Sequence, residues 1–280
     1  MSFIDNPEAA WNCVHRTAFA IASSTAMIYS ELHNFLFLKG RKVASTSFEV
    51  ALSKICGPDE VITPITPVDE RQRIDLGYRH AQNYGADPDT LNSYINLLKT
   101  KDTNQLKQAS IPKGSIKNHT TFKEALNFFG EHIKDKHVIA IIRNPYETII
   151  SRLNHIALFE NYKQSGEAMK ATDRQLQQAL HDFIKKLNKK NYPKNIDIYE
   201  PPSDTSMPLK IDYLKFEDLQ NELDRFLHSL NISESIALPH LKKGQNLPPE
   251  SILNIASPEQ LKTINSYVDD EIDAFGYQKL

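Results

Sequence analysis

The chain has 280 residues, is 40% hydrophobic and carries a formal net charge of −2, from 33 basic and 35 acidic side chains. A chain of this length and apolar content can bury one sizeable core, and we expect a single domain over residues 1–280. The balanced charge gives no overall field that would attract a polyanion, so the composition argues against a protein that binds nucleic acid.

Neither a membrane anchor nor a disulfide framework is expected from the sequence. The run from Ala18 to Tyr29 leans apolar, but many of its residues are small or polar, and it is shorter than the roughly 20 residues that span a bilayer. We expect an amphipathic helix there, no integral membrane segment, and a soluble cytoplasmic protein. Cys13 and Cys56 form no CxxC motif, which disfavours a structural zinc site and fits a reducing compartment.

Short apolar runs alternate with longer segments of helical pattern. The predicted strands are Phe35–Leu38, Ser115–Asn118, Val138–Ile142 and Leu209–Tyr213, and the helical segments that follow them are 48–55, 122–133, 146–159 and 216–230. This alternation predicts an α/β fold with three layers, in which helices flank a mostly parallel central sheet. Ligands bind such sheets at the carboxyl ends of the strands, so the residues after the predicted strands should converge on one crevice.

Two polar segments punctuated by proline interrupt the alternation, at about 63–112 and 161–208. We interpret them as insertions into the α/β domain that could bind a second substrate. The later segment contains the run 199–204, which cannot be a helix interior or a central strand because it holds two consecutive prolines. We expect a mobile surface loop there.

The segment after the first predicted strand combines cations with hydroxyl groups. It reads Lys39-Gly40-Arg41-Lys42-Val43-Ala44-Ser45-Thr46-Ser47. A helix start offers unpaired N–H groups and the positive end of the helix dipole, so phosphate can bind there with Lys42 as a point charge. The segment lacks the Walker A pattern, which disfavours ATP or GTP hydrolysis. Taken alone, it leaves open that Ser45 or Thr46 only caps the helix and that water surrounds the cations.

A second cluster follows the predicted strand Val138–Ile142. Arg143 ends this strand, Pro145 suits the first turn of a helix, and Ser151 lies between one and two turns further on. The guanidinium group is a rigid fork that matches phosphate oxygens, whereas lysine gives only a point charge. The sequence therefore predicts an anion site at Arg143, which Ser151 shares only if the chain turns back over the strand end.

With these two clusters in this order, the chain resembles the PAPS-dependent sulfotransferases, especially the carbohydrate-type and bacterial members, from Phe35 to about Gln245. In that family the first loop binds the 5′-phosphosulfate, and the residues that match or adjoin it here are Arg41, Lys42, Val43, Ala44, Ser45, Thr46 and Ser47. The family pattern Arg-Asn-Pro…Ser binds the 3′-phosphate, which implies this role for Arg143 and Ser151. The resemblance also implies a P-loop nucleotide-binding-like fold, PAPS as donor, PAP as product and no metal.

Two further segments resemble parts of the same family. The run Pro239-His240-Leu241-Lys242-Lys243-Gly244 looks like its last cofactor loop, which implies that Lys242, Lys243 and Gly244 help to bind the nucleotide. Two solvated lysines are the alternative. His119 follows a predicted strand, where family members commonly carry a general base, and a neutral imidazole can accept the proton of a hydroxyl. His155, one turn beyond Ser151, is the reserve candidate.

The sequence also departs from the family pattern. Gly40-Arg41 replaces the proline expected before the loop lysine, which leaves open whether Lys39, Arg41 or Lys42 meets the bridging oxygen. Thr148 stands where arginine is frequent, and Lys242 where asparagine is frequent. None of these changes removes an essential charge.

The expected function is the transfer of a sulfuryl group from PAPS to an acceptor hydroxyl, on a carbohydrate or a glycosylated small molecule. His119 would act as the base, and Lys42 would neutralise charge on the leaving phosphate. The two insertions are then candidates for binding the acceptor. Two alternatives stay open: a P-loop-type kinase or phosphotransferase, and a non-catalytic nucleotide-binding protein of the same fold.

Overall fold

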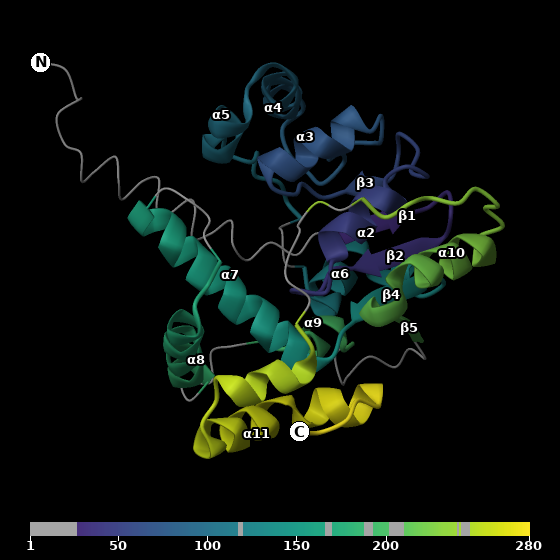
Figure 1. The fold of residues 1–280 in the computed structure, drawn as a ribbon. Coiled ribbons are helices and arrows are strands. Elements are labelled where there is room, and N and C mark those ends of the chain that lie inside the picture. The colour runs from purple at the N-terminus through teal and green to yellow at the C-terminus, as the bar shows by residue number, and fades with distance from the viewer. Residues whose placement is uncertain are drawn as a thin grey trace, which may run out of the picture. The chain divides into compact units, whose positions relative to one another are not determined.

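The computed structural model in Figure 1 describes residues 27–116, 120–165, 170–187, 193–201, 210–239, 241 and 247–280. The chain divides into two compact units. Unit 1 consists of Met1–Ile141, Ile198–Leu214 and Asp218–Leu241, and unit 2 of Ile142–Asp197, Lys215–Glu217 and Lys242–Leu280.

Unit 1 is built on a mixed, five-stranded sheet with the strand order β3-β1-β2-β4-β5. The strands are β1 (Met27–Ser30), β2 (Phe35–Leu38), β3 (Val61–Ile62), β4 (His137–Ile142) and β5 (Ile211–Lys215). β1 pairs antiparallel with β2 and with β3, whereas β2 pairs parallel with β4. The predicted α/β class is confirmed, but the prediction of a mostly parallel sheet is wrong.

The antiparallel pairs arise from a strand that the sequence pattern does not predict. The pattern predicts a helix over 18–29, yet Met27–Ser30 forms β1, while residues 18–26 lie outside the described part of the chain. Residues 31–34 join β1 to β2, and Asn34 closes this turn with φ at 53°. So short a connection can join only antiparallel neighbours, because parallel strands need a long crossover.

The prediction of a strand over Ser115–Asn118 is also wrong in the part that the structure describes. Of the segment Ser115–Asn118, residues 115 and 116 form a bend, and residues 117 and 118 lie outside the described residues. The backbone at Ile116 donates a hydrogen bond to the carbonyl of Tyr84 at 3.1 Å, which holds this segment against another loop. The apolar character of Ile116 therefore reflects burial in a loop crossing and not a place in the sheet.

The helices of unit 1 are α2 (Ser45–Leu52), α3 (Pro67–Asp75), α4 (Pro88–Thr100), α5 (Thr103–Gln108), α6 (Phe122–Phe129, continued by the 3-10 turn η1, Gly130–Ile133) and α10 (Leu219–Ser229, preceded by η2, Phe216–Asp218). The predicted insertion 63–112 thus contains α3, α4 and α5, which lie together in Figure 1. Buried side chains of α4 and α5 form a separate small core in which Leu98 is fully buried, and partly buried side chains of α3 pack against it.

Helices cover both faces of the sheet. On one face, Phe37 of β2 meets Phe48 of α2 with ring centroids 5.3 Å apart. On the other face, the ring of Tyr29 in β1 stacks on Phe129 at the end of α6, with centroids 4.1 Å apart. Tyr29 is paired across the strands with Leu36, whose side chain points away from that of Phe37 because successive residues of a strand alternate between faces.

Unit 2 is helical in its described part. Its elements are α7 (Pro145–Ser165), α8 (Asp173–Leu187), the beginning of α9 (Ile196–Tyr199), η3 (Pro249–Asn254) and α11 (Pro258–Phe275). α7 packs against α8, η3 and α11, and their contact surfaces share a core that includes Leu153, Leu180 and Ile264, all fully buried. Among the described residues of both units, none of the helices combines the length and the apolar character of a membrane span.

Glu271 of α11 caps the start of α9, although the two helices are far apart in the sequence. Its Oε1 accepts hydrogen bonds from the backbone N–H groups of Asn195 at 2.9 Å and Ile196 at 3.1 Å. Burial raises the pKa of the Glu271 carboxyl above its ordinary value, although the two backbone N–H groups act in the opposite direction. Ionisation of Glu271 therefore opposes folding at neutral pH.

This pKa predicts the pH dependence of a substitution. Because the folded-state pKa is raised, the stability contribution of Glu271 is fully present below the ordinary value of 4.5 and is lost as the pH rises through the folded-state pKa. Glu271→Gln keeps the accepting oxygen but cannot ionise. Its free energy of unfolding, minus that of the wild type, should therefore increase from pH 4 to pH 7.5 in urea titrations. Asp273→Asn, which changes an exposed carboxylate on the same helix, is the control, and a difference that decreases with pH would contradict the prediction.

Candidate functional site

The loop between β2 and α2 holds the first predicted anion site. Lys42 and Ala44 both adopt left-handed backbone conformations, with φ at 63° and 56°. Such conformations are uncommon for residues other than glycine and are often found at ligand-binding loops. Ala44 is the N-cap residue of α2, and no side chain there accepts a hydrogen bond from the first N–H groups of the helix. The helix start therefore keeps donors that suit an anion.

Other helices of the chain begin differently. The side chains that cap them are Thr66 for α3, Asp87 for α4, Asp102 for α5, Thr121 for α6 and Ser257 for α11. α10 also lacks a side-chain cap, but it continues directly from the turn η2. The start of α2, which has no side-chain cap, thus lies in the loop in which the sequence places cations and hydroxyls.

The predicted residues of the loop have two kinds of environment: some are buried and maintain its shape, and others are partly exposed. Ser45 is buried and its Oγ donates a 2.7 Å hydrogen bond to the carbonyl of Gly40, which closes the loop on itself. Val43 is fully buried and anchors the loop in the core. The side chains at positions 41, 42, 46 and 47 are partly exposed. Contacts with a ligand can therefore come from Arg41, Lys42 and the hydroxyls that follow Ser45.

Lys39 has a different environment from the other two cations. Its side chain is 2% exposed, and its Nζ lies 2.7 Å from Oε2 of Glu49, which is itself fully buried. Glu49 belongs to α2, so this ion pair joins the end of β2 to the helix that follows the loop. Of the three cations that the sequence offers for the bridging oxygen, the structure places Lys39 in the core and the other two at partly exposed positions.

The second predicted cluster lies in unit 2. Asn144 accepts a hydrogen bond from the backbone of Tyr146 at 3.0 Å, and Pro145 occupies the first turn of α7 as expected. The Nε of Arg143 donates to Oε2 of Glu147 at 3.0 Å, and its guanidinium carbon lies 3.9 Å from the ring centroid of Phe216. Stacking and pairing fix the plane of the guanidinium group.

Glu217 extends this cluster. Its carboxylate accepts one hydrogen bond from the backbone of Asn144 at 2.9 Å and another from the hydroxyl of Tyr277 at 3.1 Å. Burial and the charge of Glu217 raise the pKa of Tyr277 well above its ordinary value, so the phenol stays protonated and continues to donate. The Arg143 cluster therefore combines one cation with two carboxylates, and a bound phosphate would have to share the guanidinium group with Glu147.

The remaining predicted residues of α7 lie along one helix. Ser151 is partly buried, and His155 is exposed one turn beyond it. Thr148, at the position where the family often has arginine, is buried, and its hydroxyl oxygen has no hydrogen-bond partner among the described residues.

Four predicted residues lie outside the described residues: His119, Lys242, Lys243 and Gly244. The segment that leads to His119 is described up to residue 116 and crosses Tyr84 and Gly85 at close range. A Cβ atom on Gly114 would lie 2.3 Å from Cδ2 of Tyr84, and one on Gly85 would lie 2.8 Å from Cβ of Ser115. Glycine is thus required on both sides of this crossing.

The two clusters belong to different units, the loop to unit 1 and Arg143 with Ser151 to unit 2. Within the sheet of unit 1, Leu38 pairs with Ala140, so the carboxyl ends of β2 and β4 are neighbours. The sequence analysis did not identify Glu49 or Arg73, two buried charged residues behind the loop. The only signal for Glu49 is a single carboxylate within the apolar run 48–52.

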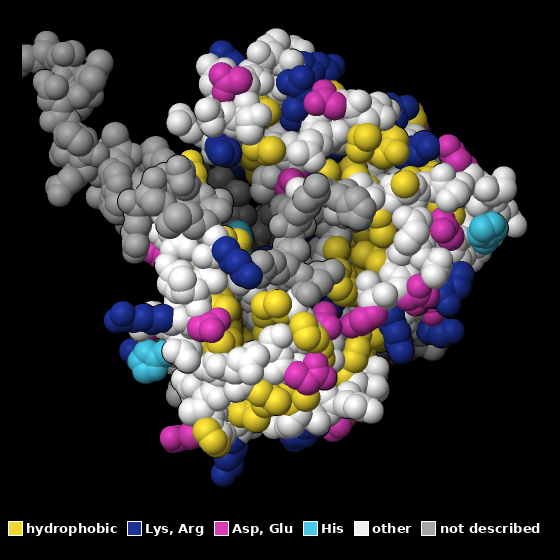
Figure 2. All heavy atoms as spheres, in the orientation of Figure 1, with side chains coloured by type: hydrophobic (Ala, Val, Ile, Leu, Met, Phe, Trp, Pro, Cys, Tyr) yellow, Lys and Arg dark blue, Asp and Glu magenta, His cyan; other side chains and the backbone are white. Residues whose placement is uncertain are grey.

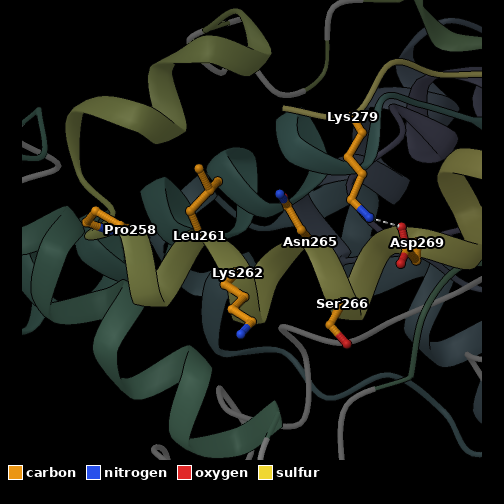
Figure 3. Close-up of a pocket in the computed structure, with 7 residues that line it drawn as sticks. All are labelled: Pro258, Leu261, Lys262, Asn265, Ser266, Asp269 and Lys279. Atoms are coloured by element: carbon orange, nitrogen blue, oxygen red, sulfur yellow. Dashed lines mark hydrogen bonds and ion pairs between the residues drawn. The ribbon is translucent and has the colours of Figure 1, made fainter.

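The molecular surface points to a functional site less clearly than the two clusters do. Figure 2 shows acidic and basic side chains interspersed over the visible face, in agreement with the small net charge. A surface concavity of about 420 Å³ lies along α11 (Figure 3), and it is lined by Pro258, Leu261, Lys262, Asn265, Ser266, Asp269 and Lys279. Lys279 pairs with Asp269, while Asn265 bonds to the hydroxyl of Tyr146 and to the carbonyl of Leu280. Its central polar groups are thus engaged within the protein, and none of the predicted site residues lines it.

Comparisons with known proteins identify no relative: no family model matches the chain, and neither a curated protein nor a solved structure matches it. In the described part of the chain, no group of three or more His, Cys, Asp or Glu side chains is arranged to hold a metal ion. The functional argument therefore rests on the residues of the two clusters and on their geometry.

The closed loop predicts the effect of removing its hydroxyl bond. Ser45→Ala leaves the buried carbonyl of Gly40 without this donor, which should lower the free energy of unfolding by about 1–2 kcal/mol. Ser47→Ala, two residues further along the same helix turn, should change it by less than about 0.5 kcal/mol. Urea denaturation measures both values, and equal effects of the two variants would show that the Ser45 bond does not hold the loop.

Proposed function

We propose that the chain is a PAPS-dependent sulfotransferase that transfers a sulfuryl group to the hydroxyl of an acceptor, with carbohydrates and glycosylated small molecules as the first acceptor class. The observation that carries the proposal is the β2–loop–α2 unit. It combines an uncapped helix start, two left-handed residues and partly exposed cations and hydroxyls in one short segment. These are the features that a phosphate-binding loop needs.

In this proposal the loop binds the 5′-phosphosulfate. Backbone N–H groups at the start of α2 and the hydroxyls of Thr46 and Ser47 donate to its oxygens, while Lys42 and Arg41 balance its charge. Ser45 and Val43 keep the loop in the shape that aims these donors. Bound PAPS supplies an activated sulfuryl group with PAP as the leaving group.

Arg143 and Ser151 would bind the 3′-phosphate. Phe216 and Glu147 hold the guanidinium group in one orientation, which favours a fixed, fork-like contact with phosphate oxygens. Lys242, Lys243 and Gly244 would add a third contact from the last loop.

His119 would be the general base. The acceptor oxygen forms a bond to sulfur as the bond from sulfur to the PAP phosphate oxygen breaks, and the hydroxyl proton passes to the imidazole. Lys42 would stabilise the charge that develops on the leaving phosphate. The helices α3, α4 and α5 of the first insertion and the later segment 161–208 are the proposed sources of acceptor specificity.

The cofactor assignment predicts selective binding of PAP. Calorimetry should give a dissociation constant in the micromolar range or tighter for PAP, about 8 kcal/mol of binding free energy, and no comparable binding of ATP. Arg143→Ala should weaken PAP binding by about 10- to 100-fold, because a charge-assisted bidentate contact is lost. Arg174→Ala, an exposed arginine of α8, is the control. A preference for ATP, or no binding of PAP by the wild type, would refute the proposal.

The assignment of the base predicts a loss of turnover without a loss of affinity. With labelled PAPS and a panel of sugar acceptors, His119→Ala should reduce sulfuryl transfer by about 10²- to 10⁴-fold while PAP binding stays within about twofold of the wild type. His155→Ala changes the reserve candidate and should transfer normally. If His155→Ala is the inactive variant, the base is His155, and if PAP binds but no acceptor is sulfated, the protein is a non-catalytic nucleotide binder.

A further inference from the structure

Four charged side chains form a buried chain of ion pairs behind the loop. Glu49 bridges two cations: its Oε2 lies 2.7 Å from Nζ of Lys39, and its Oε1 lies 2.8 Å from Nη2 of Arg73. The other terminal nitrogen of Arg73 lies 3.3 Å from Oε1 of Glu70. The four side chains are at most 2% exposed and carry balanced charge, two positive and two negative.

This chain of ion pairs connects the end of β2 with α2 and α3. Lys39 directly follows β2, Glu49 lies in the middle of α2, and Arg73 and Glu70 belong to α3. Glu70 also accepts hydrogen bonds from the backbone N–H groups of Ile65 at 3.2 Å and Ala81 at 2.8 Å. The loop is thereby joined to the first insertion by charged groups that are completely removed from water.

Stability alone does not account for the arrangement. Removing four charges from water is costly, and apolar side chains of similar size often stabilise a core as well or better. Burial disfavours the charged form of Arg73, but Glu70 and Glu49 raise its pKa above the ordinary value, so it stays charged. Its Nε is buried and has no acceptor among the described residues. What ion pairs add over apolar packing is directional geometry.

The geometry that they fix is that of the loop. On its amino-terminal side the loop departs from Lys39, which Glu49 holds. On its carboxyl-terminal side it enters α2 at Ser45, one turn before Glu49 on the same helix, and the Ser45 hydroxyl returns to the carbonyl of Gly40. Glu49 therefore holds both ends of the loop: its carboxylate pairs with Lys39 at one end, and at the other end Glu49 lies on α2 one turn after Ser45. Arg73 of α3 pairs with the same carboxylate and fixes its position.

We propose that Glu49 and Arg73 are positioning residues for the anion-binding loop, and that they couple its shape to α3 of the insertion. The inference rests on the proposed function for the identity of the ligand, but the positioning itself concerns the loop alone. Neither residue touches the ligand in this proposal. They act through Lys39 and the start of α2.

The test separates loop positioning from global stability. Lys39→Met combined with Glu49→Met removes one cation and one anion and leaves the Arg73–Glu70 pair balanced, so this variant should fold. Glu49→Gln is the second variant. Asp75→Asn is the matched control, because Asp75 pairs with Arg71 on α3 at the same 2.7 Å but at the surface. Circular dichroism checks the fold, amide hydrogen exchange of residues 40–47 reports on the loop, and PAP calorimetry reports on binding.

The double variant should be folded at the assay temperature. Each core variant that folds should exchange the amides of 40–47 at least about tenfold faster and bind PAP at least about tenfold more weakly, while Asp75→Asn matches the wild type. Folded variants with unchanged loop exchange and unchanged PAP affinity would overturn the inference. It would also be overturned if neither variant folds, because the network would then serve the fold itself. If the wild type binds no PAP, the sulfotransferase proposal fails, and the exchange rates alone still decide the positioning.

Discussion

The parallel pairing of β2 with β4 is the constraint on which the candidate site depends. Parallel neighbours require a crossover connection, and here the crossover contains α2 through α6 and the strand β3. The parallel pairing places the carboxyl ends of β2 and β4 at one edge of the sheet, with Leu38 opposite Ala140. The loop that carries Lys42 begins at that edge, directly after β2. The pairs of β1 with β2 and of β1 with β3 are antiparallel, and they widen the sheet on the side of β2 away from β4.

Elements with a strong local pattern could be predicted from the sequence, and those defined by distant partners could not. The strand Phe35–Leu38 and the part of β4 from Val138 to Ile142 are uninterrupted apolar runs, and Pro145 marks the start of α7. β1 has the sequence MIYS, which carries no strand pattern of its own and becomes a strand only through its partners on both sides. β3 has two residues, too few for any periodicity.

The same division applies to the site. The cations and hydroxyls after β2 are contiguous in the sequence, and the contact of Arg143 with Glu147 is an ordinary pair four residues apart on a helix. The pairing of Lys39 with Glu49 and of Glu49 with Arg73 spans 10 and 24 residues and depends on how α2 and α3 pack. No pattern in the sequence distinguishes these buried charges from solvated ones. The contacts of Phe216 and Glu217 beside Arg143 are equally non-local.

The cap that Glu271 provides for α9 imposes an order on folding. α9 has four residues, far fewer than an isolated helix needs to persist in water. The carboxylate that satisfies its first N–H groups is 75 residues further along the chain, on a helix that must itself be formed and packed to present it. During synthesis, residues 196–199 leave the ribosome before Glu271 does, so this cap can act only after α11 has formed and packed. The contact between Glu271 and the start of α9 therefore belongs to the late steps of folding.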